Sequence, residues 1–157
     1  MALTKVTGGL LGNLPTGTNN VAVGDTALDS IESGAQYNVA IGSAAGTAIT
    51  TGDKSTIVGA LAGTALTSGE QNTALGYAAL FSDTQGKYTT AVGWGVLQSQ
   101  NFTSDTATYN TAVGYNAGAA VTTGVQNTLI GSLAGDALTT GVQNVAVGYN
   151  ALSTEDG

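Results

Sequence analysis

Short runs of alternating character recur along the chain, and each run ends on a glycine. The run NTAVG at 110–114 is typical: Val, Ile or Leu precedes the glycine, and Val or Thr stands two residues earlier. A period of two in β-branched residues predicts a short strand with one buried face. We therefore expect these two positions to point inward. The residue between them, usually Ala, would then face a second, closely approaching surface.

The closing glycines place these strands in a repeat, and we call each repeat a rung. Successive glycines are 18, 17, 17, 17, 21, 17 and 17 residues apart. The long rung, 89–109, carries its additional residues, QNFTSDTAT, in its second half, as expected for an insertion confined to one loop of a solenoid. The repeat-defining glycines are Gly24, Gly42, Gly59, Gly76, Gly93, Gly114, Gly131 and Gly148.

Other positions recur in step with the glycines, and we call each set of equivalent positions a column. Asn usually lies four residues before the glycine, where it suits a turn and could form a ladder between rungs. An Ala-rich column follows the glycine by three residues. A second inward column contains Ile or Leu, as at Ile49 and Leu66, but is broken by Asp83 and Gln100. The segment between these columns is compatible with either a strand or one helical turn.

These columns predict an all-β fold, a parallel β-solenoid of about eight rungs of ~17 residues. Such a rung is too short for a strand with a packed crossover helix. Rungs stacked at ~4.8 Å would make a rod of roughly 40 Å. We divide the chain into a cap or attachment segment (1–19), the solenoid (20–152) and a C-terminal end (153–157).

The units NVAVG, NVAIG, NTAVG and NTLIG, with GYNAG, GYNAL and TTG, resemble the head repeats of trimeric autotransporter adhesins and repeats of bacteriophage tail fibres. The resemblance covers roughly 20–152 and implies a left-handed parallel β-roll that forms a homotrimer. The rungs are longer than those of adhesin heads, and the sequence shows no signal peptide, coiled-coil stalk or membrane-barrel anchor. We therefore expect the phage-fibre form.

A homotrimer also has a physical argument. A thin roll whose strands carry small or apolar residues on both faces cannot bury both faces alone. Packing three rolls together would cover the second face, because contiguous apolar surface marks an interface. The alternative is a monomer whose alanine face tolerates solvent.

Composition restricts the chemistry. The chain has three Lys or Arg residues, ten carboxylates and a net charge of −7, which argues against binding nucleic acid. It has no run of ~18 apolar residues, so we expect no membrane partner. It has no His and no Cys, and its carboxylates are spread over different rungs. We therefore expect no enzyme activity, catalytic residue, metal site or cofactor.

Two features are candidates for recognition. Tyr77, Trp94 and Tyr115 directly follow three successive anchor glycines, and they form either a platform for sugar rings or a structural stack. The long rung carries Phe102 and Asp105 on a loop that is either a binding site or a tolerated insertion. Adjacent threonines such as Thr122 and Thr123 precede the turn glycines, and their non-alternating spacing disfavours ice binding.

The sequence therefore predicts a structural and adhesive rod, a bacteriophage tail fibre or spike component located on the virion. Its expected partners are copies of itself, other virion or appendage proteins bound through 1–19, and a host surface glycan or protein. Alternatives are a cellular surface adhesin or extracellular filament subunit, and an ice- or glycan-binding solenoid.

Overall fold

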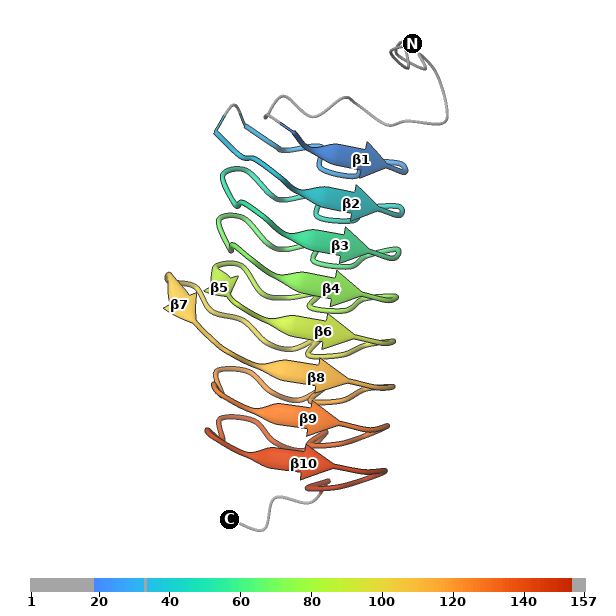
Figure 1. The fold of residues 1–157 in the computed structure, drawn as a ribbon, viewed down its shortest axis with the longest axis vertical. Coiled ribbons are helices and arrows are strands. Elements are labelled where there is room, and N and C mark those ends of the chain that lie inside the picture. The colour runs from blue at the N-terminus through green and yellow to red at the C-terminus, as the bar shows by residue number, and fades with distance from the viewer. Residues whose placement is uncertain (1–18, 33, 154–157) are drawn as a thin grey trace.

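A computed structural model describes residues 19–32 and 34–153 as a parallel β-solenoid (Figure 1). Eight three-residue strands form one parallel sheet, and the chain makes about seven turns of the solenoid between the first and the last of them. No helix occurs among the described residues. This confirms the predicted fold class. In sheet order the strands are β1 (Val21–Val23), β2 (Val39–Ile41), β3 (Thr56–Val58), β4 (Thr73–Leu75), β6 (Thr90–Val92), β8 (Thr111–Val113), β9 (Thr128–Ile130) and β10 (Val145–Val147).

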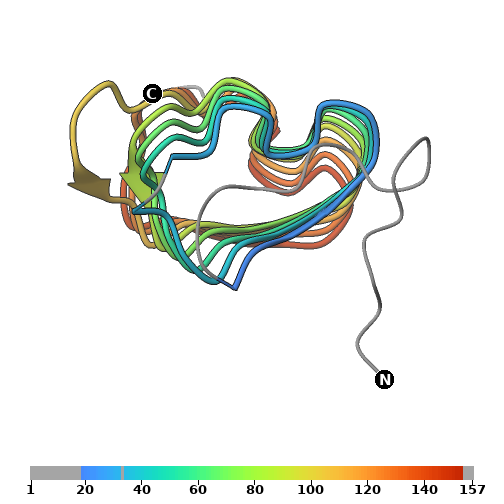
Figure 2. The same ribbon diagram turned by 90° about the horizontal axis from the view of Figure 1, so that it is seen from above.

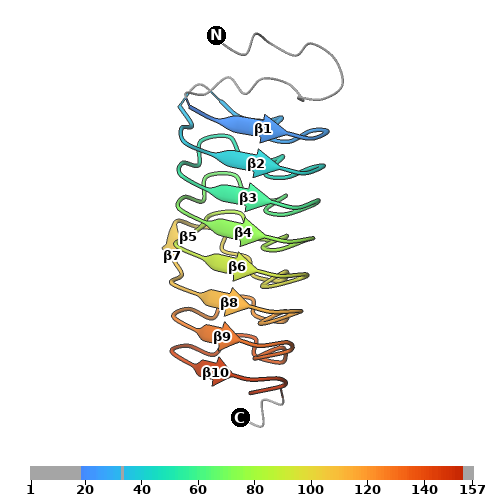
Figure 3. The same ribbon diagram turned by 45° about the vertical axis from the view of Figure 1, so that its right-hand side comes forward.

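Equivalent residues of successive rungs pair without a slip, so the strands form a regular stack along one face (Figure 3). The long rung does not disturb this register, because Thr90 pairs with Thr111. Rung-to-rung hydrogen bonds continue outside the sheet, as from the Leu80 amide to the Val96 carbonyl at 2.9 Å. The segment after the anchor glycine is neither strand nor helical turn. It is a series of turns with left-handed residues, such as Ala78 (φ 53°) and Leu80 (φ 54°).

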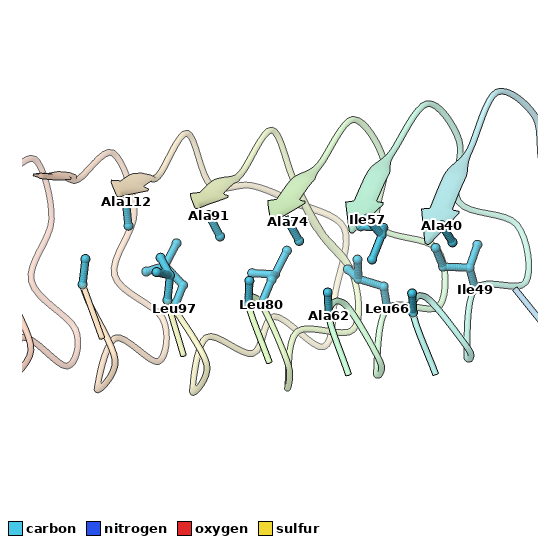
Figure 4. Close-up of a cluster of buried hydrophobic side chains, with 14 of the residues drawn as sticks. Ala40, Ile49, Ile57, Ala62, Leu66, Ala74, Leu80, Ala91, Leu97 and Ala112 are labelled. Carbon is cyan, nitrogen blue, oxygen red and sulfur yellow. The ribbon is translucent and has the colours of Figure 1, made fainter. Parts of the chain in front are cut away.

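The predicted alternation of the strands is present, but our assignment of its faces is wrong. The middle residue points into the core, as at Ala74 and Ala91, which are fully buried. The flanking aliphatic residues point outward, and Leu75 remains 37% exposed. The physical reason is that the opposite wall fills the narrow interior with large side chains such as Leu80 and Leu97, which leaves room for little more than a methyl group (Figure 4).

Two core columns compensate for each other in volume. Rungs with Ala at the middle of the strand can carry Leu on the opposite wall, as with Ala74 and Leu80. The rung with Leu129 in the strand instead carries Gly135, and a Cβ there would lie 2.8 Å from a Leu129 methyl carbon. Ile57 and Gly63 form a similar pair. In these rungs a large residue in one column is paired with a small residue in the other. Two rungs have Ala with Gly (Ala40 with Gly46, Ala112 with Gly118), and there large side chains of neighbouring rungs approach the glycine, as Leu97 and Leu129 do at Gly118.

The asparagine column forms the expected ladder, but it bonds to backbone rather than mainly to other amides. Asn38 accepts a hydrogen bond at Oδ1 from the Ser55 amide (2.9 Å) and donates from Nδ2 to the Gly52 carbonyl (2.7 Å). Asn127 makes the equivalent bonds to the Asn144 amide and the Gly141 carbonyl. Each of these asparagine side chains thus donates to a carbonyl of its own rung and accepts from a backbone amide of the next rung. These bonds satisfy buried backbone groups that the short strands leave unpaired.

The anchor glycines turn the chain sharply at the end of each strand. Gly76 has φ +127°, a conformation that side chains disfavour, and a Cβ there would overlap the Gly93 carbonyl of the next rung. The glycine column is therefore required by both conformation and stacking. The expected cap or attachment segment, 1–19, falls almost entirely outside the described residues, as does most of the C-terminal end.

Candidate recognition surface

The outer surface of the sheet consists of two columns that alternate with the buried one. The first column carries Thr in five successive rungs, and the registers of β3, β4, β6, β8 and β9 place these threonines side by side. They are Thr56, Thr73, Thr90, Thr111 and Thr128. The second column is aliphatic throughout and includes Leu75 and Ile130. We call these two columns the outer face. Its T-x-V alternation was visible in the sequence but was assigned to the core.

An exposed column of residues directly after the anchor glycines borders the outer face, and we call it the exit column. The Tyr77 and Trp94 ring centroids lie 5.7 Å apart with 14° between planes, and Trp94 and Tyr115 lie 5.2 Å apart with 15°. The sequence therefore correctly placed these three rings in one column. The rings cover one another's faces, so the ring faces left uncovered by the stack are the outer faces of Tyr77 and Tyr115.

A second exposed column precedes the strands on the other border of the outer face. Here Tyr88 and Tyr109 stack with centroids 5.2 Å apart and only 5° between their planes. Tyr37 occupies the same column, but its neighbour in the next rung is Lys54. Lys54 and Asp25 are the only charged residues in the outer face and its two bordering columns over the described rungs. This surface is consequently almost free of charge.

The long rung contributes a loop rather than an extension of the aromatic surface. Its strand β7 (Thr106–Ala107) pairs in parallel with β5 (Gly86–Lys87) of the preceding rung, and the loop that carries β7 projects from the outline shared by the other rungs (Figure 2). They lie beyond the starts of the main strands, whereas the exit column follows the strand ends (Figure 1). The structure therefore does not bring the loop to Tyr77, Trp94 and Tyr115.

The two loop candidates differ in position. Phe102 is only 8% exposed, and its amide and carbonyl are bonded to the neighbouring rung, so it belongs to the interior. Asp105 is exposed and pairs with Lys87, with Oδ2 2.8 Å from Nζ, and Glu70 lies 3.5 Å from the same Nζ. Hydrogen bonding to Asp105 raises the pKa of Lys87, so this lysine stays charged.

The residues that interrupted the second inward column form a buried polar cluster. Gln100 donates from Nε2 to Asp83 Oδ2 (2.7 Å) and to Thr89 Oγ1 (3.1 Å), and it accepts from Asn110 Nδ2 (2.8 Å). The Phe102 amide donates to Asp83 Oδ1 (2.9 Å). Burial raises the pKa of Asp83, while these donated hydrogen bonds oppose that shift. The cluster holds the base of the projecting loop.

In the threonine pairs near the turn glycines, the first hydroxyl bonds to the next rung. Thr67 donates through Oγ1 to the Thr84 carbonyl at 3.0 Å, and Thr122 donates to the Thr139 carbonyl at 3.1 Å. These hydroxyls close the rung-to-rung network. The second threonines of the pairs, Thr51, Thr123 and Thr140, are exposed but do not recur in every rung, whereas the outer face carries Thr in five successive rungs.

The described residues include no group of three carboxylates close enough to hold a metal ion. In residues 19–32 and 34–153 there is likewise no helix with the length and hydropathy to cross a bilayer. The arrangement consists of a rigid scaffold, an uncharged face bordered by stacked rings, and one projecting loop. Comparison with known protein families, curated proteins and solved structures finds no match for the chain.

Proposed function

We propose that this protein is a structural and adhesive rod that works as a homotrimer, as a component of a bacteriophage tail fibre or spike on the virion. The observation that carries the proposal is the exposed aliphatic column of the outer face. Ile41, Leu75 and Ile130 are each 37–40% exposed. Among the described residues, the outer face and its two bordering columns carry only two charged side chains, those of Lys54 and Asp25. Contiguous apolar surface of this kind marks an interface.

The size of the surface supports a contact between copies of the chain. Eight strands at ~4.8 Å give a length of about 38 Å, and the three extended residues of each strand give a width of roughly 10 Å. The resulting area of about 380 Å² lies within the ~300–600 Å² of apolar patches that mark functional surfaces. A rod that buries this face around an axis would gain both stiffness and protection from proteases.

The oligomeric state tests the trimer. Light scattering of the purified chain should give three times the chain mass, and Leu75→Lys should reduce it to the monomer. Thr47→Lys, on a different side of the rung, is the matched control and should leave the trimer intact. A monomeric wild type refutes the trimer, and long fibrils would instead favour an extracellular filament subunit.

The adhesive and virion roles need separate tests. In this proposal 1–19 attaches the rod to other virion proteins, and the solenoid presents a surface to a host glycan or protein. Deletion of 1–19 should leave the trimer intact but abolish incorporation into particles. Retained incorporation would refute the attachment role, and a protein displayed on a cell rather than a particle would favour the cellular adhesin.

The outward threonine column favours ice binding as a second candidate. Its five hydroxyls recur once per rung, as a periodic surface requires. Stacked rings border it, however, and these interrupt a flat contact. Thermal hysteresis that disappears in Thr90→Lys would support this function, and its absence in the wild type would refute it.

A further inference from the structure

The exit column contains one break between aromatic residues. Its sequence from the first rung to the last is Asp25, Ser43, Ala60, Tyr77, Trp94, Tyr115, Ser132 and Tyr149. Ser132 therefore follows three stacked rings and precedes another tyrosine. We call this position the Ser132 gap. No other single non-aromatic residue in either bordering column of the described rungs lies between two aromatic residues.

The spacing of the gap suits one inserted ring. Register places Tyr115 one rung before Ser132 and Tyr149 one rung after it, because Val113 pairs with Ile130 and Ile130 with Val147. Two rungs span about 9.6 Å. The rings that already stack in this column do so at 5.2 and 5.7 Å, which is close to half that span. A ring held above Ser132 would thus continue the existing stack.

The chemistry of the gap selects the kind of ring. Its walls are the tyrosines at positions 115 and 149, which are 52% and 77% exposed. Its floor is a serine hydroxyl, and the phenol hydroxyls add further polar groups. A pyranose ring has two C–H faces that suit aromatic walls and a girdle of hydroxyls that suits polar edges. The chain's net charge of −7 disfavours an anionic ring.

From this arrangement we infer that the Ser132 gap is a subsite for one neutral pyranose unit of a glycan. Tyr115 and Tyr149 stack on the two faces of the sugar, and Ser132 Oγ bonds to one of its hydroxyls. The inference deepens the proposed adhesive role and rests on it for the source of the sugar. It does not depend on the trimer, because the gap lies at the border of the outer face.

Saturation-transfer NMR on the full chain tests the subsite with methyl pyranosides of glucose, galactose and mannose and with N-acetylglucosamine. At least one sugar should receive saturation, strongest at its ring C–H protons. Ser132→Tyr fills the gap with the chain's own ring and should weaken that binding by at least about tenfold. Ala60→Tyr extends the same column at its other end and should leave binding unchanged. Tyr149→Ala removes one wall and should also weaken binding.

Each outcome decides the inference. If no pyranoside binds the wild type, or if Ser132→Tyr binds as well as the wild type, the subsite is refuted. Binding of phenol in place of every sugar would also refute it and would assign the gap to an aromatic side chain of a partner. Circular dichroism and light scattering of the same samples report folding and the trimer separately, so a failed trimer and a failed subsite are distinguishable.

Discussion

Volume compensation in the core gives a sharp prediction for Leu129 and Gly135. Leu129→Ala removes a fully buried side chain from the strand and should cost about 2–5 kcal/mol of unfolding free energy. Gly135→Leu alone adds a side chain whose Cβ would lie only 2.8 Å from a Leu129 methyl carbon. Overpacking of this kind costs about 1–3 kcal/mol. The double variant recreates the arrangement of Ala74 and Leu80.

The double variant should therefore be destabilised far less than the two single changes together. Backbone conformation permits the exchange, because Gly135 has φ 63° and Leu80 already adopts φ 54°. Additivity would place the double variant at about 3–8 kcal/mol, whereas compensation should bring it to about 2 kcal/mol or less. Urea unfolding followed by circular dichroism measures all four proteins. A double variant no more stable than additivity allows would refute the compensation argument.

Three further changes test other parts of the rod. Gly76→Ala should cost about 2–6 kcal/mol in urea unfolding, because strained φ and overlap with the next rung combine. Gly148→Ala keeps the strain without the overlap and should cost less, so equal losses would argue against the stacking requirement. Asn127→Ala should cost about 1–3 kcal/mol and speed hydrogen exchange at the Asn144 amide, and unchanged exchange would contradict the ladder. Burial raises the folded-state pKa of Asp83 above 3.8, so the folded chain binds this proton more tightly than the unfolded chain. Its contribution to stability should be fully present below pH 3.8 and lost as pH rises through the folded pKa, and Asp83→Asn should remove that slope; an unchanged slope would contradict the assignment.

Much of the architecture could be predicted because it is local and repeated. The anchor glycines and the asparagine column each repeat at nearly constant spacing, and in-register stacking converts each sequence column into a column in space. The stack of Tyr77, Trp94 and Tyr115 followed from the same rule. These features need only the period of the chain and the chemistry of turns.

The recognition surface was less accessible to sequence reasoning. Its aromatic residues were identified, but the outer face was missed because its Thr and aliphatic residues were assigned to the core. Phe102 was assigned to the surface because it lies in an inserted segment. Only the structure shows that its backbone is tied to Asp83 of the preceding rung. A hydrogen bond between rungs of unequal length, such as the one from Phe102 to Asp83, cannot be predicted from the residues around either partner.

The sequence by itself determined the period, the strands and the points where rungs turn and bond, since these depend on neighbouring residues and on repetition. Only the tertiary structure decided which face of each strand lies inside. Alternation along a strand does not say which of its two faces is buried. In the rungs with Leu80 and Leu97 the opposite wall leaves space in the strand for Ala alone, and a larger residue such as Leu129 points inward only where the opposite wall has glycine. The aliphatic residues are therefore turned outward because the interior volume is already filled.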